Sequence, residues 1–559
     1  MTTVKTSPSE PSIRPEERAD RARPEVTQAQ IRASVDGIVS RRPAVGLGVC
    51  CVRDGRLGSF HGRGLADIAS NTPITQDTVF RIASITKLFT ATAVMQLWER
   101  GLVDLDAPAS DYLRAYKLIP TKVGWRSPTV RQLLTHTSGI PDVRRVSDLL
   151  HAGWTPADGR PPLLSAEVGD RLPSLAEYYS GALRVVVEPG SAFAYSNHGY
   201  ATLGQIVEDV SGIPLERYFR ERIFGPLGMA DTDLVRSNRV ASRLATGYAF
   251  GRHGAKAVPD RDWIGAGACG AYSTPRDMGR FVTALLSGGA NERGRVLESA
   301  TLATMFEPHY RPDARLPGMG LGFFRADAAG HRLLFHDGIL PGFNSELLMA
   351  PDDGIGAIGF TNGSSGAFAW LSVELGRLVR DMIGLPEDGV RSDVPHRPDV
   401  WAELCGRYVF PPNVADLRQR LIFGGGAEVF AGGGRLMIRL LTPVPVLYRG
   451  LPLQPDDKTD PYAFRLDLSQ FGMQPVRVVF GAVIDGRAGA IHSDLGGQPW
   501  SLMRAPEATT GDAWLRPALG ALAAVTVASA ARSIRRRRLG DRRGVDAMTT
   551  RAQSCPDRG

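Results

Sequence analysis

The stretch FRIASITKLFTATAVMQLWER, residues 80–100, contains a lysine in a chain that uses very few of them. Only six of the 66 basic residues are lysine, at positions 5, 87, 117, 122, 256 and 458. Lys87 follows Ser84 by three residues, where the pattern predicts a loop that enters an apolar helix ending at Gly101. Arginine would serve solubility equally well there, so the position indicates chemistry that requires an amine.

Ser84 and Lys87 would share one helix face, which brings the amine within reach of the hydroxyl. A serine hydroxyl is a poor nucleophile until a base removes its proton. Lysine can be that base when burial or a neighbouring cation lowers its pKa, whereas arginine stays protonated. The helix N-terminus would also favour a developing alkoxide on Ser84. The spacing therefore predicts an activated serine, with a plain N-cap serine as the alternative because Ser-x-x-Lys is a weak motif alone.

A second segment, EPGSAFAYSNHGYATLGQIVEDVSG, supplies Tyr195 and Asn197 at the start of an amphipathic helix. The tyrosine would be a second proton carrier, and the asparagine amide would hold a carbonyl oxygen.

A third segment, LLFHDGILPGFNSE, supplies His336 and Gly338 at the end of a predicted strand. Gly338 would let a substrate lie against the backbone. The N–H of Ile339, just beyond it, would face the N–H of Ser84 and complete an oxyanion hole.

These three motifs, in this order and with these gaps, resemble the serine β-lactamase and penicillin-binding protein superfamily, whose members carry Ser-x-x-Lys. The likeness is to class C β-lactamases, D-alanyl-D-alanine carboxypeptidases and related esterases, and it covers about residues 30–385. The stretches VRQLLTHTSGIPD, FGPLGMADTDL and GAGACGAYSTPRDMGRF are similar to that family's connecting motifs. The resemblance implies an α+β fold, in which helices and an all-helical subdomain flank an antiparallel sheet.

The resemblance also implies roles for the site residues. Ser84 would be the acylated nucleophile, Lys87 its base or proton relay, and Tyr195 the base and acid for the leaving group and the deacylating water. Asn197 would be a substrate ligand. His336 stands where β-lactamases usually have lysine, and its partial charge at pH 7 would make it a weaker anion anchor.

Asp337 departs from the family pattern, which commonly has a small residue at this position. A carboxylate that faced the cleft would repel the carboxylate of penicillins and D-Ala-D-Ala peptides. We therefore expect a serine hydrolase of the esterase or amidase type, which takes neutral small-molecule esters or amides. The alternatives are a β-lactamase or D-alanyl-D-alanine carboxypeptidase, and a non-hydrolysing binding protein on the same fold.

The remaining motifs give no support for another kind of catalytic, cofactor or metal site. The chain has no nucleophile elbow, no phosphate-binding glycine loop and no metalloprotease His/Glu spacing, so neither a cofactor nor a metal is expected. His136 is expected to make a structural hydrogen bond. Five scattered cysteines form neither a disulfide framework nor a zinc motif.

The predicted organisation is two domains with tails. Residues 1–26 form a disordered tail, 27–385 the hydrolase domain, 386–400 a linker, 401–506 a β-rich, lipocalin-like domain and 507–559 a second tail. Within the hydrolase domain, Asp54-Gly55 predicts a β-hairpin, and strands near both ends of the domain predict one antiparallel sheet with helices between them. Short strands separated by turns predict a small barrel after residue 400.

The formal charge of +8 comes largely from the arginine run at residues 532–543, so nucleic-acid binding is not predicted. The N-terminal residues contain no apolar segment of the secretory type, which predicts a cytoplasmic protein. The apolar stretch at residues 517–531 has 15 residues, fewer than the ~17–25 that usually span a bilayer. It is expected to be a surface helix, with docking of residues 517–543 on an anionic membrane as the alternative.

Overall fold

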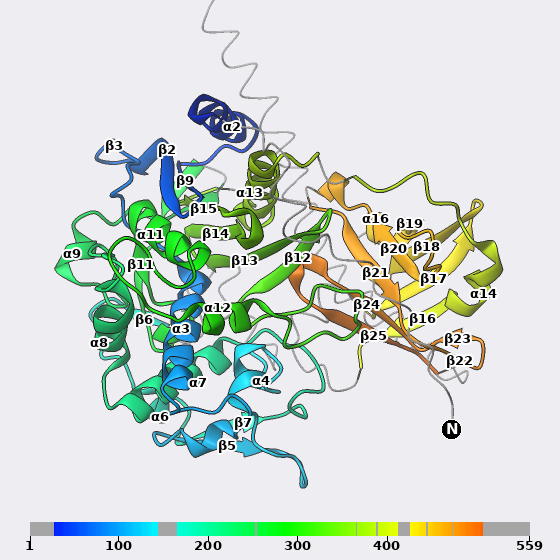
Figure 1. Ribbon diagram of the computed structural model, residues 1–559, viewed down its shortest axis with the longest axis horizontal. Coiled ribbons are helices and arrows are strands. Elements are labelled where there is room, and N and C mark those ends of the chain that lie inside the picture. The colour runs from blue at the N-terminus through cyan, green and yellow to red at the C-terminus, as the bar shows by residue number, and fades with distance from the viewer. Residues whose placement is uncertain are drawn as a thin grey trace, which may run out of the picture.

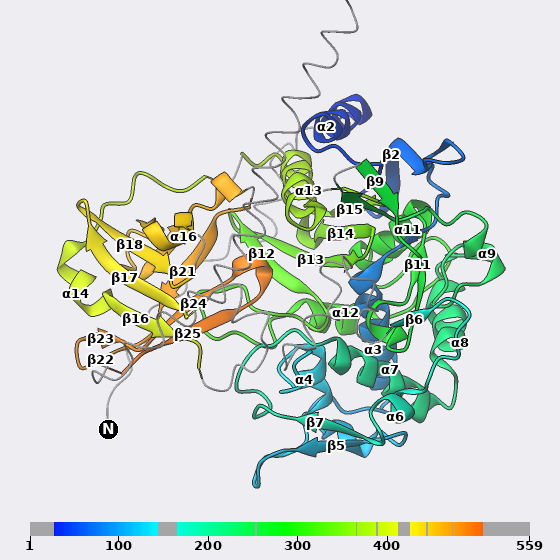
Figure 2. The same cartoon turned by 180° about the vertical axis from the view of Figure 1, so that it is seen from behind.

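The computed structural model has a larger domain, built on one antiparallel sheet, and a smaller closed β-barrel beside it (Figure 1). The view from behind shows the same arrangement (Figure 2). The structure describes residues 27–142, 165–251, 254–364, 366–386, 389–411, 425–442, 445–471 and 473–506. The two predicted tails therefore lie outside the described residues, and the expectations about them remain predictions.

The sheet begins with the predicted hairpin. Asp54 and Gly55 have φ angles of 50° and 66°, as a tight two-residue hairpin turn requires. They join β1 (Gly46–Arg53) to β2 (Arg56–Asp67). The sheet has seven strands in the order β12-β13-β14-β15-β1-β2-β3. The remaining strands are β3 (Thr72–Pro73), β12 (Phe324–Ala328), β13 (His331–Leu340), β14 (Phe343–Ala350) and β15 (Ile355–Thr361).

On the side of strand β13 away from β14, only the first half of the strand has a neighbouring strand. Strand β12 pairs with residues 331–335 of β13 and does not continue along residues 336–340. The second half of β13, which carries the third motif, is thus a sheet edge near the Ser84 turn.

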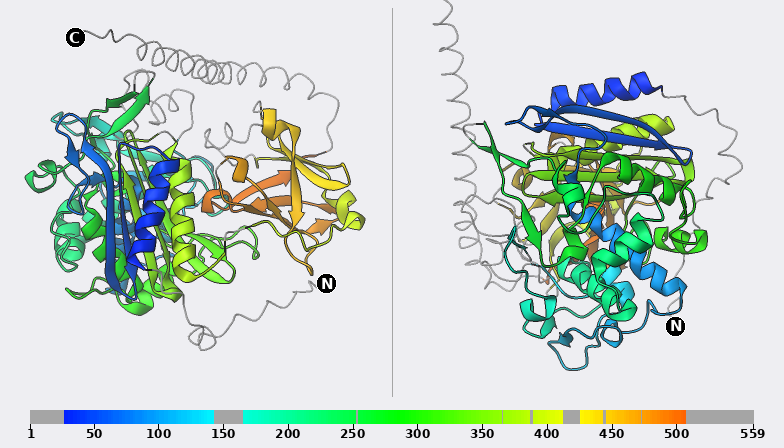
Figure 3. Two further views of the ribbon diagram at one scale, coloured as in Figure 1. Left: turned by 90° about the horizontal axis from the view of Figure 1, so that it is seen from above. Right: turned by 90° about the vertical axis from the view of Figure 1, so that its left-hand side faces the viewer.

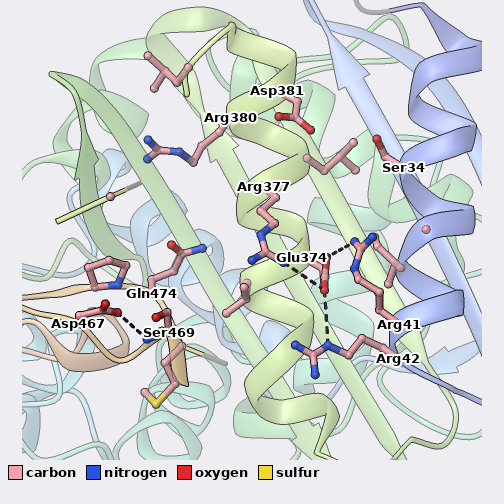
Figure 4. A pocket seen from close by; sticks show the side chains of 18 of the residues that line it. Ser34, Arg41, Arg42, Glu374, Arg377, Arg380, Asp381, Asp467, Ser469 and Gln474 are labelled. Carbon is pink, nitrogen blue, oxygen red and sulfur yellow. Dashed lines mark hydrogen bonds and ion pairs between the residues drawn. The ribbon is translucent and has the colours of Figure 1, made fainter. Parts of the chain in front are cut away.

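Two helices, α2 (Gln28–Arg41) and α13 (Ala367–Ile383), cover one face of the sheet side by side (Figure 3). Their apolar residues form one buried cluster with that face. Glu374 of α13, with a side chain only 1% exposed, ties them together. Its carboxylate lies 2.7 Å from Arg41 and 3.5 Å from both Arg42 and Arg377. A groove of about 680 Å³ opens here, between α2, α13 and barrel residues such as Gln474 (Figure 4).

The other face carries the helical region, including α3 (Thr86–Glu99), α7 (Asn197–Ser211), α10 (Ala266–Cys269) and α11 (Pro275–Leu286). The region is not all-helical, because it also holds small two-stranded sheets. These pair β5 (Lys117–Pro120) with β7 (Ala182–Val185), β6 (Ser165–Glu167) with β10 (Arg261–Trp263), and β8 (Tyr248–Gly251) with β9 (Gly254–Ala257). Strands of three or four residues are too short for alternation to reveal them in the sequence.

The predicted barrel is confirmed. Eight strands close it in the order β16-β17-β18-β19-β20-β21-β24-β25, and its interior is filled by apolar residues such as Val429, Leu453 and Phe480. The strands are β16 (Gly406–Val409), β17 (Ala427–Gly432), β18 (Arg435–Leu440), β19 (Leu451–Pro455), β20 (Ala463–Leu466), β21 (Val476–Phe480), β24 (Ala490–Ser493) and β25 (Trp500–Arg504). In the part of the chain that the structure describes, no helix has the length and apolar character needed to cross a membrane.

Candidate active site

Ser84 lies on a tight turn that rests directly on β13. The short strand β4 (Phe80–Arg81) leads into a 3-10 turn, η1 (Ala83–Ile85), which continues into α3. Ala83 has a φ of 52°, a left-handed conformation that is unfavourable for a residue with a Cβ. Ser345 donates a hydrogen bond of 2.7 Å to the carbonyl oxygen of Ile82 and fixes the turn to β14.

Lys87 is fully buried and lies at the centre of the site. Its Nζ is 3.0 Å from Ser84 Oγ, 2.7 Å from Asn197 Oδ1 and 2.8 Å from the carbonyl oxygen of Ala268. A neutral amine has two N–H donors and one lone pair. Two of these groups only accept, whereas the hydroxyl of Ser84 can donate as well as accept, so the amine is placed to take a proton from Ser84 once it is neutral. The predicted contact between Ser84 and Lys87 is present.

Asn197 contacts Lys87 and Asp142, and its expected contact with substrate stays a prediction. Its Oδ1 accepts from Lys87, and its Nδ2 donates to Asp142 Oδ2 at 2.6 Å. Its backbone N–H donates to the other oxygen of Asp142, also at 2.6 Å. In this structure Asn197 orients Lys87, and Asp142 orients Asn197.

Sequence reasoning missed Asp142 and the Ala268 carbonyl as parts of the site. Asp142 closes the stretch VRQLLTHTSGIPD, which resembles a family connecting motif, but no local spacing links it to a residue 55 positions later. Ala268 contributes a backbone atom, which no side-chain pattern could reveal.

Tyr195 completes the cluster around the nucleophile. Its phenol is hydrogen-bonded with Ser84, and its ring centroid lies 4.8 Å from Lys87 Nζ. The rings of His136 and Phe324 lie near-parallel to it, with centroid distances of 4.3 and 6.3 Å. Burial and the charge of Asp337 hold the pKa of the Tyr195 phenol well above its ordinary value. The phenol is therefore protonated at neutral pH.

His136 makes the structural hydrogen bond that was predicted. Its Nδ1 accepts from the backbone N–H of Ser196 at 3.0 Å. The bond holds the imidazole beside the ring of Tyr195, so His136 contributes to the site by packing.

His336 is fully buried and uncharged. Its Nδ1 lies 2.7 Å from the carbonyl oxygen of Asp337 and so carries the hydrogen, which leaves a bare lone pair on Nε2. Burial and the nearby Lys87 lower the pKa of His336 to about 3. The partial positive charge expected at pH 7 is therefore absent.

Asp337 does not face the cleft. It is paired with Glu346 across β13 and β14, so both side chains lie on one face of the sheet. Glu346 is buried and accepts a hydrogen bond of 2.7 Å from Ser372 of α13. Since side chains alternate along a strand, His336 and Gly338 lie on the opposite face. The expected repulsion of substrate carboxylates by Asp337 was wrong, because the residue points toward the helix layer.

Gly338 faces the nucleophile turn. A Cβ at this position would lie 2.4 Å from the carbonyl oxygen of Ile82 and 2.3 Å from Ser345 Oγ. The glycine thus lets the turn pack on β13, and its expected contact with substrate stays a prediction.

Ile339 lies on the open half of β13 and is 45% exposed. Leu340 and Phe343 close the two-residue turn between β13 and β14, so this pair exchanges backbone hydrogen bonds. The N–H of Ile339 therefore points away from β14, toward the sheet edge. This direction suits the predicted oxyanion hole.

Within the described ranges, no group of three or more His, Cys, Asp or Glu side chains is placed to hold a metal ion. A serine hydroxyl, a buried amine and a protonated phenol, all in mutual contact, can carry out acyl transfer with proton relay.

Comparisons with known proteins show which family the chain is similar to. The family model named Beta-lactamase matches residues 31–373. Penicillin-binding protein 4 of Amycolatopsis lactamdurans is 28% identical, over 67% of this chain and 95% of its own length. Esterase EstB of Burkholderia gladioli is 30% identical, over 53% of this chain and 79% of its own.

The solved structures show a likeness in fold over much of the chain. A penicillin-binding protein homologue from Pyrococcus abyssi superposes with a TM-score of 0.54 at 22% identity, covering 86% of this chain and 100% of that one. A D-amino acid amidase from Ochrobactrum anthropi has a TM-score of 0.50 at 27% identity, covering 63% and 98%. The family model matches more than half of the chain, and this chain belongs to the β-lactamase family of serine hydrolases.

Proposed function

We propose that this serine hydrolase acts on neutral carboxylic esters and small amides in preference to β-lactams. The observation that carries the proposal is the state of His336, which is fully buried and has a pKa of about 3. A neutral imidazole gives no ionic anchor for a carboxylate, which penicillins and D-Ala-D-Ala peptides carry. The likeness to a protein named as an esterase supports the same choice.

Acylation would begin at Ser84. Its Oγ attacks the substrate carbonyl carbon, and its proton moves to Lys87 Nζ across 3.0 Å. The new ammonium donates to Asn197 Oδ1 and the Ala268 carbonyl, which are already in place. The N–H groups of Ser84 and Ile339 would stabilise the oxyanion.

Tyr195 would be the proton donor to the leaving group. Because its pKa is raised well above the ordinary value, the phenol keeps its proton until an alkoxide develops beside it. It then recovers a proton from the ammonium of Lys87, so the charge of the site is unchanged after acylation.

Deacylation would use the same two groups. A water molecule attacks the acyl carbon and gives a proton to Lys87, while Tyr195 returns a proton to the departing Ser84 oxygen. Proton transfer from Lys87 to Tyr195 restores the starting state, and the net reaction is hydrolysis of one ester or amide bond.

The test is a comparison of kcat/KM for p-nitrophenyl butyrate, a matching p-nitroanilide, nitrocefin and a D-Ala-D-Ala peptide. Ser84→Ala should abolish every reaction, and Ser70→Ala, an exposed serine, is the matched control. The proposal expects the ester or anilide to exceed nitrocefin. A larger kcat/KM for nitrocefin or the peptide would refute the preference and leave the hydrolase assignment intact.

A further inference from the structure

The loop between α12 (Ser299–Phe306) and β12, residues 307–319 and here named the arm, connects the hydrolase domain to the barrel. At its tip, Arg315 donates a hydrogen bond of 2.9 Å to Asp460 Oδ2 and another of 2.6 Å to the carbonyl oxygen of Phe480. Arg477 of the barrel donates a hydrogen bond of 3.2 Å to the carbonyl oxygen of Arg315. The arm is thus bonded to the barrel through side chain and backbone.

The tip is also pre-organised and packed. Asp313 accepts two hydrogen bonds from the guanidinium of Arg315, at 2.8 and 2.7 Å, and so fixes its direction. The next residue, Leu316, is only 2% exposed and packs with Ala463 and Val479 of the barrel. Apolar burial and charged hydrogen bonds therefore act together at this contact.

The base of the arm lies against the active site. Two backbone hydrogen bonds join Tyr310 and Met319. The N–H of Tyr310 donates to the carbonyl oxygen of Met319 at 3.3 Å, and the N–H of Met319 donates to that of Tyr310 at 2.9 Å, which closes the arm into a loop. Met319 is fully buried with Phe193 and Phe324, and the ring of Tyr195 packs against this cluster. We name Phe193, Met319 and Phe324 the apolar wall.

The barrel also reaches this wall directly. The ring of Trp500 lies 6.5 Å from that of Phe193, edge to face. Gly497 lies so close to Phe335 that a Cβ on the glycine would be 2.1 Å from the ring. Phe335 in turn lies 5.6 Å from Phe324.

We propose that the barrel is a positioning element of the active site, and that Arg315 is the positioning residue that couples the two domains. The inference rests on the proposed acyl-enzyme chemistry. Tyr195 must keep its phenol within hydrogen-bond reach of Ser84, and a displacement of about 1 Å can cost about 100-fold in rate. The wall holds the ring of Tyr195, and the arm and Trp500 hold the wall.

The experiment compares Arg315→Ala and Asp460→Ala with Arg439→Ala. Arg439 is a matched control because its side chain is also 32% exposed and it also makes a 2.9 Å ion pair, with Glu428 inside the barrel. Each full-length variant is checked by circular dichroism. The readouts are kcat and KM for p-nitrophenyl butyrate, and the rate of Ser84 labelling by a fluorophosphonate.

We expect Arg315→Ala to lower kcat and the labelling rate by about 10- to 100-fold, with KM changed less than about threefold. Asp460→Ala should lower both by about 3- to 10-fold, because Asp313 and the Phe480 carbonyl still hold Arg315. Arg439→Ala should stay within about twofold of the wild type.

The labelling rate separates this inference from the proposed function. If the wild type is labelled but does not turn over esters, the ester proposal fails, and the labelling rates still test the coupling. If Arg315→Ala does not fold, kcat and the labelling rate of Asp460→Ala test the proposal instead. A folded variant that keeps kcat and labelling within twofold of the wild type would overturn the proposal.

Discussion

Asp142 and Asn197 are joined by two hydrogen bonds of 2.6 Å, one from the backbone N–H of Asn197 and one from its side-chain amide. This bidentate contact leaves the amide only one orientation, with Oδ1 toward the amine of Lys87. The base of the proposed reaction is therefore positioned by a carboxylate that never touches the nucleophile.

Replacing this carboxylate should weaken the site. In Asp142→Asn, an NH₂ group would face one of the N–H donors of Asn197, and that buried donor would lose its partner. We expect kcat to fall by about 10- to 100-fold and the free energy of unfolding by about 1–3 kcal/mol. Steady-state kinetics and urea unfolding measure both. Asp209→Asn is the control, because Asp209 also accepts from two backbone N–H groups but on the surface. Equal effects in the two variants would contradict the orienting role.

Lysine should be irreplaceable at position 87. Lys87→Arg keeps a cation but removes the only protonation change available to the side chain. We expect fluorophosphonate labelling of Ser84 to slow by about 10²- to 10⁴-fold, as for loss of a general base. Lys117→Arg, at an exposed lysine, should label at the wild-type rate. Labelling of Lys87→Arg at more than a tenth of that rate would show that Lys87 is not the base.

The sequence predicts best those contacts that are local or periodic. Ser84 and Lys87 are three residues apart on a helix, and the hairpin at Asp54-Gly55 is set by its own turn residues. Such geometry follows from backbone rules alone. The barrel could also be predicted as a class, since its short strands and turns repeat.

The sequence predicts poorly what depends on tertiary packing. Alternation fixes that Asp337 and His336 point to opposite faces, but only the finished sheet shows which face meets the nucleophile turn. The partners of Asn197 come from segments 55 and 110 residues away. The charge of His336 depends on burial, which no motif encodes.

A methyl group at position 338 should separate the nucleophile turn from β13. In Gly338→Ala the new Cβ would clash with a backbone oxygen, that of Ile82, which cannot rotate away. We expect a destabilisation of about 1–3 kcal/mol and loss of Ser84 labelling. Thermal unfolding and labelling of the same sample measure these.

Two further variants test this reasoning. Adding Ser345→Ala to Gly338→Ala removes the second clash but not the first, so it should not restore labelling. Gly376→Ala, within α13, meets only a side-chain end at 3.4 Å and should be neutral or stabilising. Full labelling of Gly338→Ala would disprove the tight packing.

Glu374 should matter for stability and not for catalysis. Its buried carboxylate lies close to Arg41, Arg42 and Arg377 (Figure 4). Glu374→Gln leaves these cations without their shared counter-charge, and we expect a loss of about 1–3 kcal/mol in urea unfolding with kcat unchanged. Glu428→Gln, in a one-third exposed pair, should cost less than about 1 kcal/mol. A fall in kcat for folded Glu374→Gln would show that this face communicates with the site.

The buried, neutral His336 should make folding sensitive to acid. Its pKa is about 3 in the folded chain, against an ordinary value of 6.5, so between these values the unfolded chain binds a proton that the folded chain does not. The free energy of unfolding must then fall as the pH falls from 6.5 toward 3, by up to about 1.4 kcal/mol per pH unit. His336→Gln removes this contribution, whereas His309 and His492, whose pKa values are also lowered, remain in both proteins. Urea unfolding at pH 7.5, 6 and 5 should therefore show the wild type losing stability faster than the variant. Parallel losses would mean that His336 is protonated in the folded state, and the argument for neutral substrates would fall with its neutrality.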